Sequence, residues 1–154
     1  MYVRSKTRKF NKLGLHTETV CFPADIAEDD LLAEIRRLND DSLFHGILVQ
    51  LPLPREFDSG KILSEVSPEK DVDGFHPVNL GRIVQGRTDG LVPCTPAGIV
   101  KLLEWGGVEL SGKRAVVVGR SRIVGIPVSL LLCRKGVDAT VTIAHSRTPD
   151  LAET

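Results

Sequence analysis

A turn that carries two glycines is one stretch of this sequence whose residue types and spacing suit ligand chemistry. Residues 119–125 read Gly-Arg-Ser-Arg-Ile-Val-Gly, between the apolar run Ala115–Val118 and the helix-length apolar segment Ile126–Cys133. A strand, a tight turn and a helix open a dinucleotide-binding βαβ unit, because the free N–H groups of the helix can face a pyrophosphate. The spacing is G-x-S-x-x-x-G rather than G-x-G-x-x-G, so a packing turn without a ligand is the alternative.

The segment after this unit indicates which dinucleotide would bind. Residues 138–144 alternate and are β-branched, which predicts the next strand. An NAD site usually places an acid at the end of that strand, but residues 145–148 read His-Ser-Arg-Thr. Together with Arg120, these hydroxyl and guanidinium groups suit an additional 2′-phosphate, so we expect NADP. The alternative is that the arginines of this region are solvated surface charges: Arg120, Arg122 and Arg147.

Three polar residues of the first half are also placed for chemistry. Tyr2 and Lys6 lie four positions apart, on one face of a predicted helix. Gln50 follows the apolar run Gly46–Val49, at the end of a predicted strand, where α/β proteins place ligand contacts. By spacing alone, Tyr2 and Lys6 are more typical of a solvated helix face than of a site.

Two acids, Asp71 and Asp73, lie in a stretch dense in polar and turn-forming residues, 69–77. On residue type alone they are turn acids. The sequence that follows, residues 79–90, contains several glycines and is predicted to continue as a loop.

The elements that must position these residues alternate between helix and strand. The patterns predict helices at Tyr2–Leu13, Asp29–Leu38 and about Ile62–Val66, and strands at Leu15–Phe22 and Gly46–Val49. A further helix is expected to begin with Thr95 as its N-cap and Pro96 as its first residue, and to end at Gly106-Gly107. The strand Ala115–Val118 is apolar throughout, as expected where both faces are covered. This alternation indicates an α/β fold.

Composition limits the classes of function. The chain has 154 residues with 20 basic and 20 acidic side chains, so nothing suggests nucleic acid or an anionic membrane as the main partner. Three widely spaced cysteines without a C-x-x-C pattern argue against a metal site and favour a reducing, cytoplasmic location. No apolar run is long enough to cross a bilayer, and the first residues lack a secretory signal.

The ends of the sequence lead to a separate expectation. The chain begins in helix-like sequence and stops where a doubly wound domain would start its second helix. We therefore expect an internal fragment of a longer protein or a truncated gene product, and we expect the isolated 154-residue chain to be inactive.

Five motifs occur in order along the chain. They are Y-V-x-S-K at Tyr2–Lys6, G-I-L-V-Q-L-P-L-P at Gly46–Pro54, P-x-K-D-V-D-G-F at Pro68–Phe75, P-C-T-P-x-G at Pro93–Gly98 and V-V-V-G-R-S-x-I-V-G-x-P at Val116–Pro127. Taken together, they closely resemble the bifunctional methylenetetrahydrofolate dehydrogenase/methenyltetrahydrofolate cyclohydrolase family. The resemblance covers essentially the whole chain, while the family's own chain is nearly twice as long.

The resemblance implies a role for each matching position. Tyr2 would stack on the folate, Lys6 would be the catalytic lysine oriented by Gln50, and Asp73 would accept the pterin N–H groups, which makes Lys6, Gln50 and Asp73 the catalytic set. The substrate-binding positions would be Tyr2, Val3, Lys6, Val49, Gln50, Leu51 and Asp73. The NADP-binding positions would be Gly119, Arg120, Ser121 and Ser146, and no metal is expected.

The same resemblance implies the architecture and activity. Residues 1–93 would form a three-layer α/β folate-binding catalytic domain, and residues 94–154 the start of a Rossmann-type NADP-binding domain, both incomplete. The activity would be NADP-dependent oxidation of 5,10-methylenetetrahydrofolate and hydrolysis of the product to 10-formyltetrahydrofolate, in one-carbon metabolism, by a homodimer when complete. The alternatives are a dehydrogenase of another small metabolite and an inactive truncated product.

Overall fold

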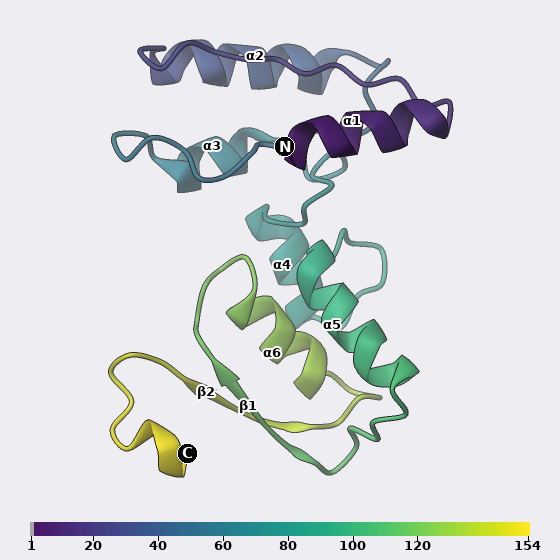
Figure 1. The fold of residues 1–154 in the computed structure, drawn as a ribbon, viewed down its shortest axis with the longest axis vertical. Coiled ribbons are helices and arrows are strands. Elements are labelled where there is room, and N and C mark those ends of the chain that lie inside the picture. The colour runs from purple at the N-terminus through teal and green to yellow at the C-terminus, as the bar shows by residue number, and fades with distance from the viewer. Residues whose placement is uncertain (1) are drawn as a thin grey trace.

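The computed structural model describes the backbone of residues 2–154 and the side chains of residues 3–154. Helices α1, α2 and α3 gather at one end of the long axis, the strands with α5 and α6 occupy the other end, and α4 lies between them (Figure 1). The elements are α1 (Tyr2–Lys12), α2 (Glu28–Asp40), α3 (Ser59–Glu65), α4 (Pro77–Val84), α5 (Cys94–Trp105), β1 (Arg114–Val118), α6 (Gly125–Cys133), β2 (Thr140–Ala144) and the 3₁₀ helix η1 (Leu151–Glu153).

The first half is built on α2 and α3. Its core consists of buried aliphatic side chains from these helices and the segments beside them: Leu32, Ile35, Ile47, Ile62 and Val66. Lys70 closes the end of α2, because its Nζ donates to the carbonyls of Leu38, Asn39 and Asp41 at 2.6–2.9 Å. An ammonium group at this end satisfies carbonyls that have no partner inside the helix.

The prediction of two strands in this half is wrong. Residues 15–22 form no strand, and residues 46–49 form a single parallel β-bridge, from Ile47 to Asp71. Among residues 2–93 the structure therefore contains no strand, and the expected three layers around a sheet are not seen there. The physical reason is that a strand needs a neighbour to satisfy its N–H and C=O groups. Among the described residues, the first run has no such neighbour and the second has only the single bridge from Ile47 to Asp71.

The helix predictions are confirmed at α1, α2 and α3, and Gly14 follows α1 with a φ of +71°. Helix α4 contradicts the predicted loop over residues 79–90. Pro77 stands in its first turn, and His76 Nδ1 accepts the N–H of Val78 at 3.1 Å. Both features mark the start of a helix, but the glycines of residues 79–90 led to the prediction of a loop.

Helix α5 starts earlier than expected. Pro93 occupies the N-cap position and Cys94 is the first helical residue, so the prediction of Thr95 as N-cap is wrong by two residues. The C-terminal end is confirmed, since Gly106 is the C-cap and Gly107 has a φ of +69°. A proline is tolerated at position 96, in the first turn of α5, because the N–H groups of that turn have no acceptor inside the helix.

The second half is the predicted strand–turn–helix–strand unit. Strands β1 and β2 pair in parallel, with Arg114 opposite Thr140 and Val118 opposite Ala144. Helix α6 covers one face of the pair, packing Val128 and Leu131 against Ala115 and Val117. On the other face Val116 and Val118 are 45% and 68% exposed, so the expected cover on both faces of β1 is not present among the described residues.

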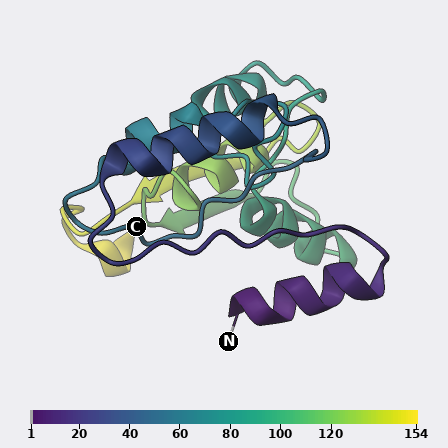
Figure 2. The ribbon, with the colours of Figure 1, turned by 90° about the horizontal axis from the view of Figure 1, so that it is seen from above.

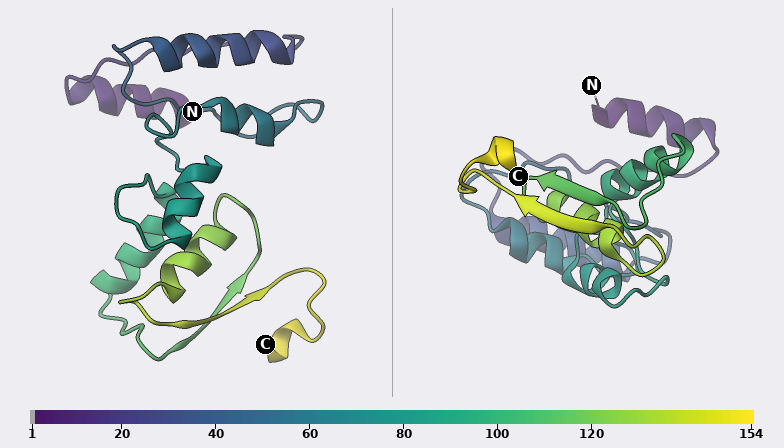
Figure 3. Two further views of the ribbon diagram at one scale, coloured as in Figure 1. Left: turned by 180° about the vertical axis from the view of Figure 1, so that it is seen from behind. Right: turned by 90° about the horizontal axis from the view of Figure 1, so that it is seen from below.

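Helix α1 stands away from the rest of the molecule (Figures 2 and 3). Its side chains Phe10 and Leu13 are 44% and 74% exposed. The chain then returns along α2, where Arg37 pairs with Glu18 at 3.3 Å. None of the described helices has the length and apolar character that crossing a membrane requires.

Leu32→Ala should lower the free energy of unfolding by about 2–5 kcal/mol, because it opens a cavity in the core of α2 and α3. Leu32 is 1% exposed, while Leu43 is 76% exposed and provides the control, since Leu43→Ala should stay within about 0.5 kcal/mol of the wild type. Urea denaturation of both variants measures the difference. Equal destabilisation by the two substitutions would contradict this location of the core.

Candidate functional site

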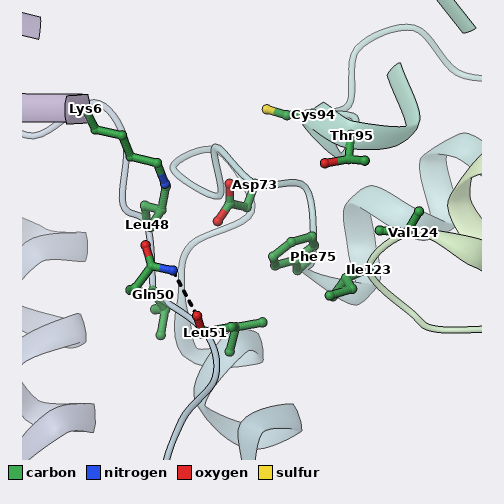
Figure 4. A pocket seen from close by; sticks show the side chains of 11 residues that line it. Lys6, Leu48, Gln50, Leu51, Asp73, Phe75, Cys94, Thr95, Ile123 and Val124 are labelled. Carbon is green, nitrogen blue, oxygen red and sulfur yellow. Dashed lines mark hydrogen bonds between the residues drawn. The ribbon is translucent and has the colours of Figure 1, made fainter. Parts of the chain in front are cut away.

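A cavity of about 210 Å³ lies between the two halves of the molecule. Its lining comes from α1, from the segment after the Ile47 bridge, from the turn after Asp71, from the start of α5 and from the turn between β1 and α6 (Figure 4). The lining residues are Lys6, Leu48, Val49, Gln50, Leu51, Asp73, Phe75, Cys94, Thr95, Ile123 and Val124. The fold thus brings together five of the predicted substrate positions and the predicted nucleotide turn.

Lys6 and Gln50 line the cavity from two separate segments and lie on the same side of it (Figure 4). The Gln50 side chain donates from Nε2 to the carbonyl of Leu51 at 2.9 Å. Because the nitrogen is used in this way, the amide presents its oxygen on the Lys6 side (Figure 4). An acceptor in that position can accept a hydrogen bond from an N–H of Lys6 Nζ and hold the amine toward the cavity.

Asp73 provides the acid of the cavity. Burial raises the pKa of the Asp73 carboxyl above its ordinary value, the positive charge of Lys6 opposes this shift, and the negative charge of Asp71 adds to it. The carboxyl group of Asp73 is therefore partly desolvated, and its ionised form is stabilised only where a partner donates hydrogen bonds to it. Paired N–H donors of a ligand would satisfy both oxygens.

The remaining wall is largely apolar and was not assigned by sequence reasoning. Phe75 and the pair Ile123 and Val124 supply carbon surface, and Thr95 and Cys94 supply a hydroxyl and a thiol. The segments that carry these residues contain family-like motifs, but the sequence assigns no ligand contact to these side chains. Only the folding of α5 and the nucleotide turn against the Asp73 segment reveals that they share one cavity.

The turn between β1 and α6 fits a dinucleotide phosphate. Gly119 has a φ of +127°, and a Cβ at Gly125 would collide with the carbonyl of Gly119, so the backbone approaches itself closely here. Ser121 Oγ accepts the N–H groups of Val124 and Gly125 at 3.2 Å each. Both lone pairs are then used, which leaves the hydroxyl hydrogen to donate outward to an anion.

The ends of the two strands bring Arg120 and Ser146 to one edge. Gly119 donates to the carbonyl of Ala144 at 2.7 Å, and the exposed residues Arg120 and Ser146 follow these two positions. A hydroxyl and a guanidinium at the carboxyl edge of a parallel pair fit the placing of a nucleotide ribose and its phosphates.

Two predicted substrate residues remain, Tyr2 and Val3. The side chain of Tyr2 lies outside the described residues, and Val3 is 38% exposed without lining the cavity. Over the side chains of residues 3–154, the structure has no group of His, Cys, Asp and Glu residues arranged to hold a metal ion.

Comparison with known proteins gives two family models that together match most of the chain. The model described as "Tetrahydrofolate dehydrogenase/cyclohydrolase, catalytic domain" matches residues 1–73. The model described as "Tetrahydrofolate dehydrogenase/cyclohydrolase, NAD(P)-binding domain" matches residues 93–154.

The chain is also similar to individual proteins. It is 55% identical over 152 residues to "Bifunctional protein FolD" of Enterococcus faecalis, covering 99% of this chain and 53% of that protein. The chain thus spans about half the length of the curated relatives it matches.

Solved structures give the same picture. The bifunctional enzyme FolD from Campylobacter jejuni, a methylenetetrahydrofolate dehydrogenase/cyclohydrolase, is 42% identical with a TM-score of 0.93, over 99% of this chain and 53% of that one. The Trypanosoma brucei dehydrogenase-cyclohydrolase, solved with NADP and an inhibitor, is 44% identical with a TM-score of 0.88, over 96% of this chain and 50% of that one.

Asp73→Asn should change stability in a pH-dependent way. The raised pKa means that the native state holds its proton more tightly than the unfolded state, so the wild type loses stability as pH rises through the native pKa. The variant has no such loss, so it should match the wild type below the ordinary pKa of aspartate and exceed its stability above the raised one.

Urea denaturation between about pH 3 and pH 7 measures this difference. Asp25→Asn, at an exposed loop position, controls for the removal of one negative charge. A wild type that gains stability over Asp73→Asn with rising pH would contradict the assignment of a desolvated carboxyl.

Proposed function

Because the chain belongs to the tetrahydrofolate dehydrogenase/cyclohydrolase family, we propose that its protein uses NADP to oxidise 5,10-methylenetetrahydrofolate and then hydrolyses the methenyl product to 10-formyltetrahydrofolate. The observation that carries this proposal is the cavity in which Lys6, Gln50 and Asp73 face the nucleotide turn. A folate bound by Lys6, Gln50 and Asp73 would share this cavity with the nucleotide turn. In this proposal residues 1–93 bind the folate and residues 94–154 the nucleotide.

The residues of the nucleotide turn fit the cofactor that the family implies. Gly119, Ser121 and the first turn of α6 would hold the pyrophosphate, and Arg120 with Ser146 would hold the 2′-phosphate, which favours NADP over NAD. When bound, NADP supplies the acceptor for a hydride.

In the oxidation, the residues of this chain bind and align the folate. Asp73 would accept two N–H groups of the pterin, and Tyr2 would stack against its rings. The carbon surface of Phe75, Ile123 and Val124 would exclude water from the reacting carbon. Hydride transfer needs no nucleophile from the protein, so alignment in a cavity shielded from water is the main contribution.

In the hydrolysis, Lys6 would transfer protons and Gln50 would orient Lys6. Water adds to the carbon of the cationic methenyl group, and a neutral Lys6 amine takes the proton that the water loses. Cleavage of one C–N bond then opens the ring, and the proton goes to the departing nitrogen. The oxygen of Gln50 would hold Lys6 Nζ in line for both transfers.

Two assays test the proposal. Reduction of NADP with methylenetetrahydrofolate reports the oxidation, and loss of methenyltetrahydrofolate absorbance reports the hydrolysis. The protein that carries this chain should catalyse both, and NAD should be the poorer acceptor. Reduction of NADP with another small metabolite and none with folate would instead support a different dehydrogenase.

Lys6→Met should abolish the hydrolysis, with a loss of at least about a hundredfold, because the proton acceptor is removed. The affinity for NADP should not change, since Lys6 lies on the folate side of the cavity. Lys12→Met is the matched control, because Lys12 is exposed at the end of the same helix and should retain both activities. Retained methenyl hydrolysis in Lys6→Met would overturn this role.

Arg120→Ala should weaken NADP binding by about tenfold or more while leaving NAD binding nearly unchanged, because only NADP carries the 2′-phosphate. Arg122→Ala is the control from the same turn, since the Arg122 guanidinium lies beside Gly60 at the start of α3. Titration of both dinucleotides against each variant measures the ratio. Equal weakening of NADP and NAD by Arg120→Ala would contradict the proposed contact.

A further inference from the structure

Asp71 is a buried carboxylate, 5% exposed, that lies beside the cavity but does not line it. Its Oδ1 accepts the N–H of Phe75 at 3.1 Å and its Oδ2 accepts the N–H of His76 at 2.8 Å. Its own carbonyl accepts the N–H of Gly74 at 3.0 Å. These bonds close the turn around Asp73, so the direction of the Asp73 carboxyl depends on Asp71.

Asn79 completes the arrangement from inside α4 and has no exposed surface. Its Nδ2 donates to Asp71 Oδ2 at 2.9 Å and to the carbonyl of Pro68 at 2.8 Å. Its Oδ1 accepts from Arg82 at 3.0 Å and from the N–H of Leu91 at 3.3 Å. A carboxamide has two donor hydrogens and two acceptor lone pairs, and all four are used here.

The Asp73 turn also touches the opposite wall of the cavity. Gly74 has a φ of +69°, and a Cβ there would lie 2.6 Å from the nitrogen of Pro93. Pro93 immediately precedes α5, whose first residues Cys94 and Thr95 line the cavity. Through Leu91 and Pro93, the same contacts that hold Asp73 therefore also hold the start of α5.

We propose that the Asp71–Asn79 pair is a positioning device, which fixes Asp73 relative to the start of α5 and so sets the folate side of the cavity. This rests on the proposed function, which takes a folate as the ligand of Asp73. Stability alone does not account for the pair, because a buried carboxylate that gives its bonds to N–H groups is costly to desolvate compared with a well-packed apolar group. What such bonds provide is one fixed backbone geometry.

Hydrogen exchange of this chain tests the positioning without any ligand. Asn79→Ala should speed exchange of the Phe75 and His76 amides by about tenfold or more, although both amides bond to Asp71 and not to Asn79. Ile62→Val is the matched control, because Ile62 is fully buried in the core of α2 and α3 and its side chain can take no part in the hydrogen bonds of Asp71 and Asn79. Unchanged exchange at Phe75 and His76, relative to this control, would overturn the proposal.

Arg82→Met provides a milder variant in case Asn79→Ala fails to fold. It removes one of the four bonds of Asn79 and keeps the carbon stem of Arg82 that lies against Gly90. Exchange at the same two amides should rise in the same direction by a smaller factor. No rise in this variant, with Asn79→Ala unfolded, would count against the pair as a positioning device.

Steady-state kinetics connects the pair to folate chemistry. Asn79→Ala should raise the KM for methylenetetrahydrofolate and lower kcat while the affinity for NADP stays unchanged, whereas Ile62→Val should leave both affinities intact. A variant with faster exchange but wild-type folate kinetics would overturn the positioning role. If the wild type itself binds no folate while the exchange result holds, the proposed function fails and the structural role of the pair survives.

Discussion

The close approach of Gly74 to Pro93 is the constraint on which the site depends. The molecule has two separate hydrophobic cores, one around α2 and α3 and the other around α6 and the strands. Apolar packing fixes the interior of each core but leaves their relative placement to whatever bridges them. The backbone contact at Gly74 supplies that bridge, since any larger residue there would collide with Pro93.

Around this contact, polar groups rather than apolar ones set the geometry. Lys70 closes α2, Asp71 closes the turn, and Asn79 joins α4 to the segment before α5. No buried side-chain nitrogen or oxygen among the described residues lacks a hydrogen-bond partner. A fully satisfied network of this kind resists alternative arrangements, because each alternative leaves a buried donor or acceptor unpaired.

The cavity combines charge and carbon surface in a way that suits the proposed two-step chemistry. Lys6 and Asp73 line the same cavity, and the partial burial of Asp73 indicates that water is partly excluded there. Phe75, Ile123 and Val124 extend the carbon surface toward the nucleotide turn. Both proposed steps can then take place in one cavity. The hydride transfer needs a site that excludes water, and the hydrolysis needs a positioned amine as proton acceptor.

Sequence alone determined what depends on neighbouring residues. The helices at α1, α2 and α3, the β1–α6–β2 unit and the glycine turn follow from local periodicity and from glycine geometry, and motif order was enough to identify the family. Tertiary structure decided what depends on partners. Residues 15–22 have a strand-like sequence but no paired neighbour among the described residues, and residues 46–49 form only one bridge, from Ile47 to Asp71. Helix α4 forms where glycines predicted a loop. Asp71 resembled a turn acid, and only the fold shows its bonds to Phe75, His76 and Asn79, on which the proposed positioning of Asp73 rests. The bond to Asn79 joins positions that no local pattern connects.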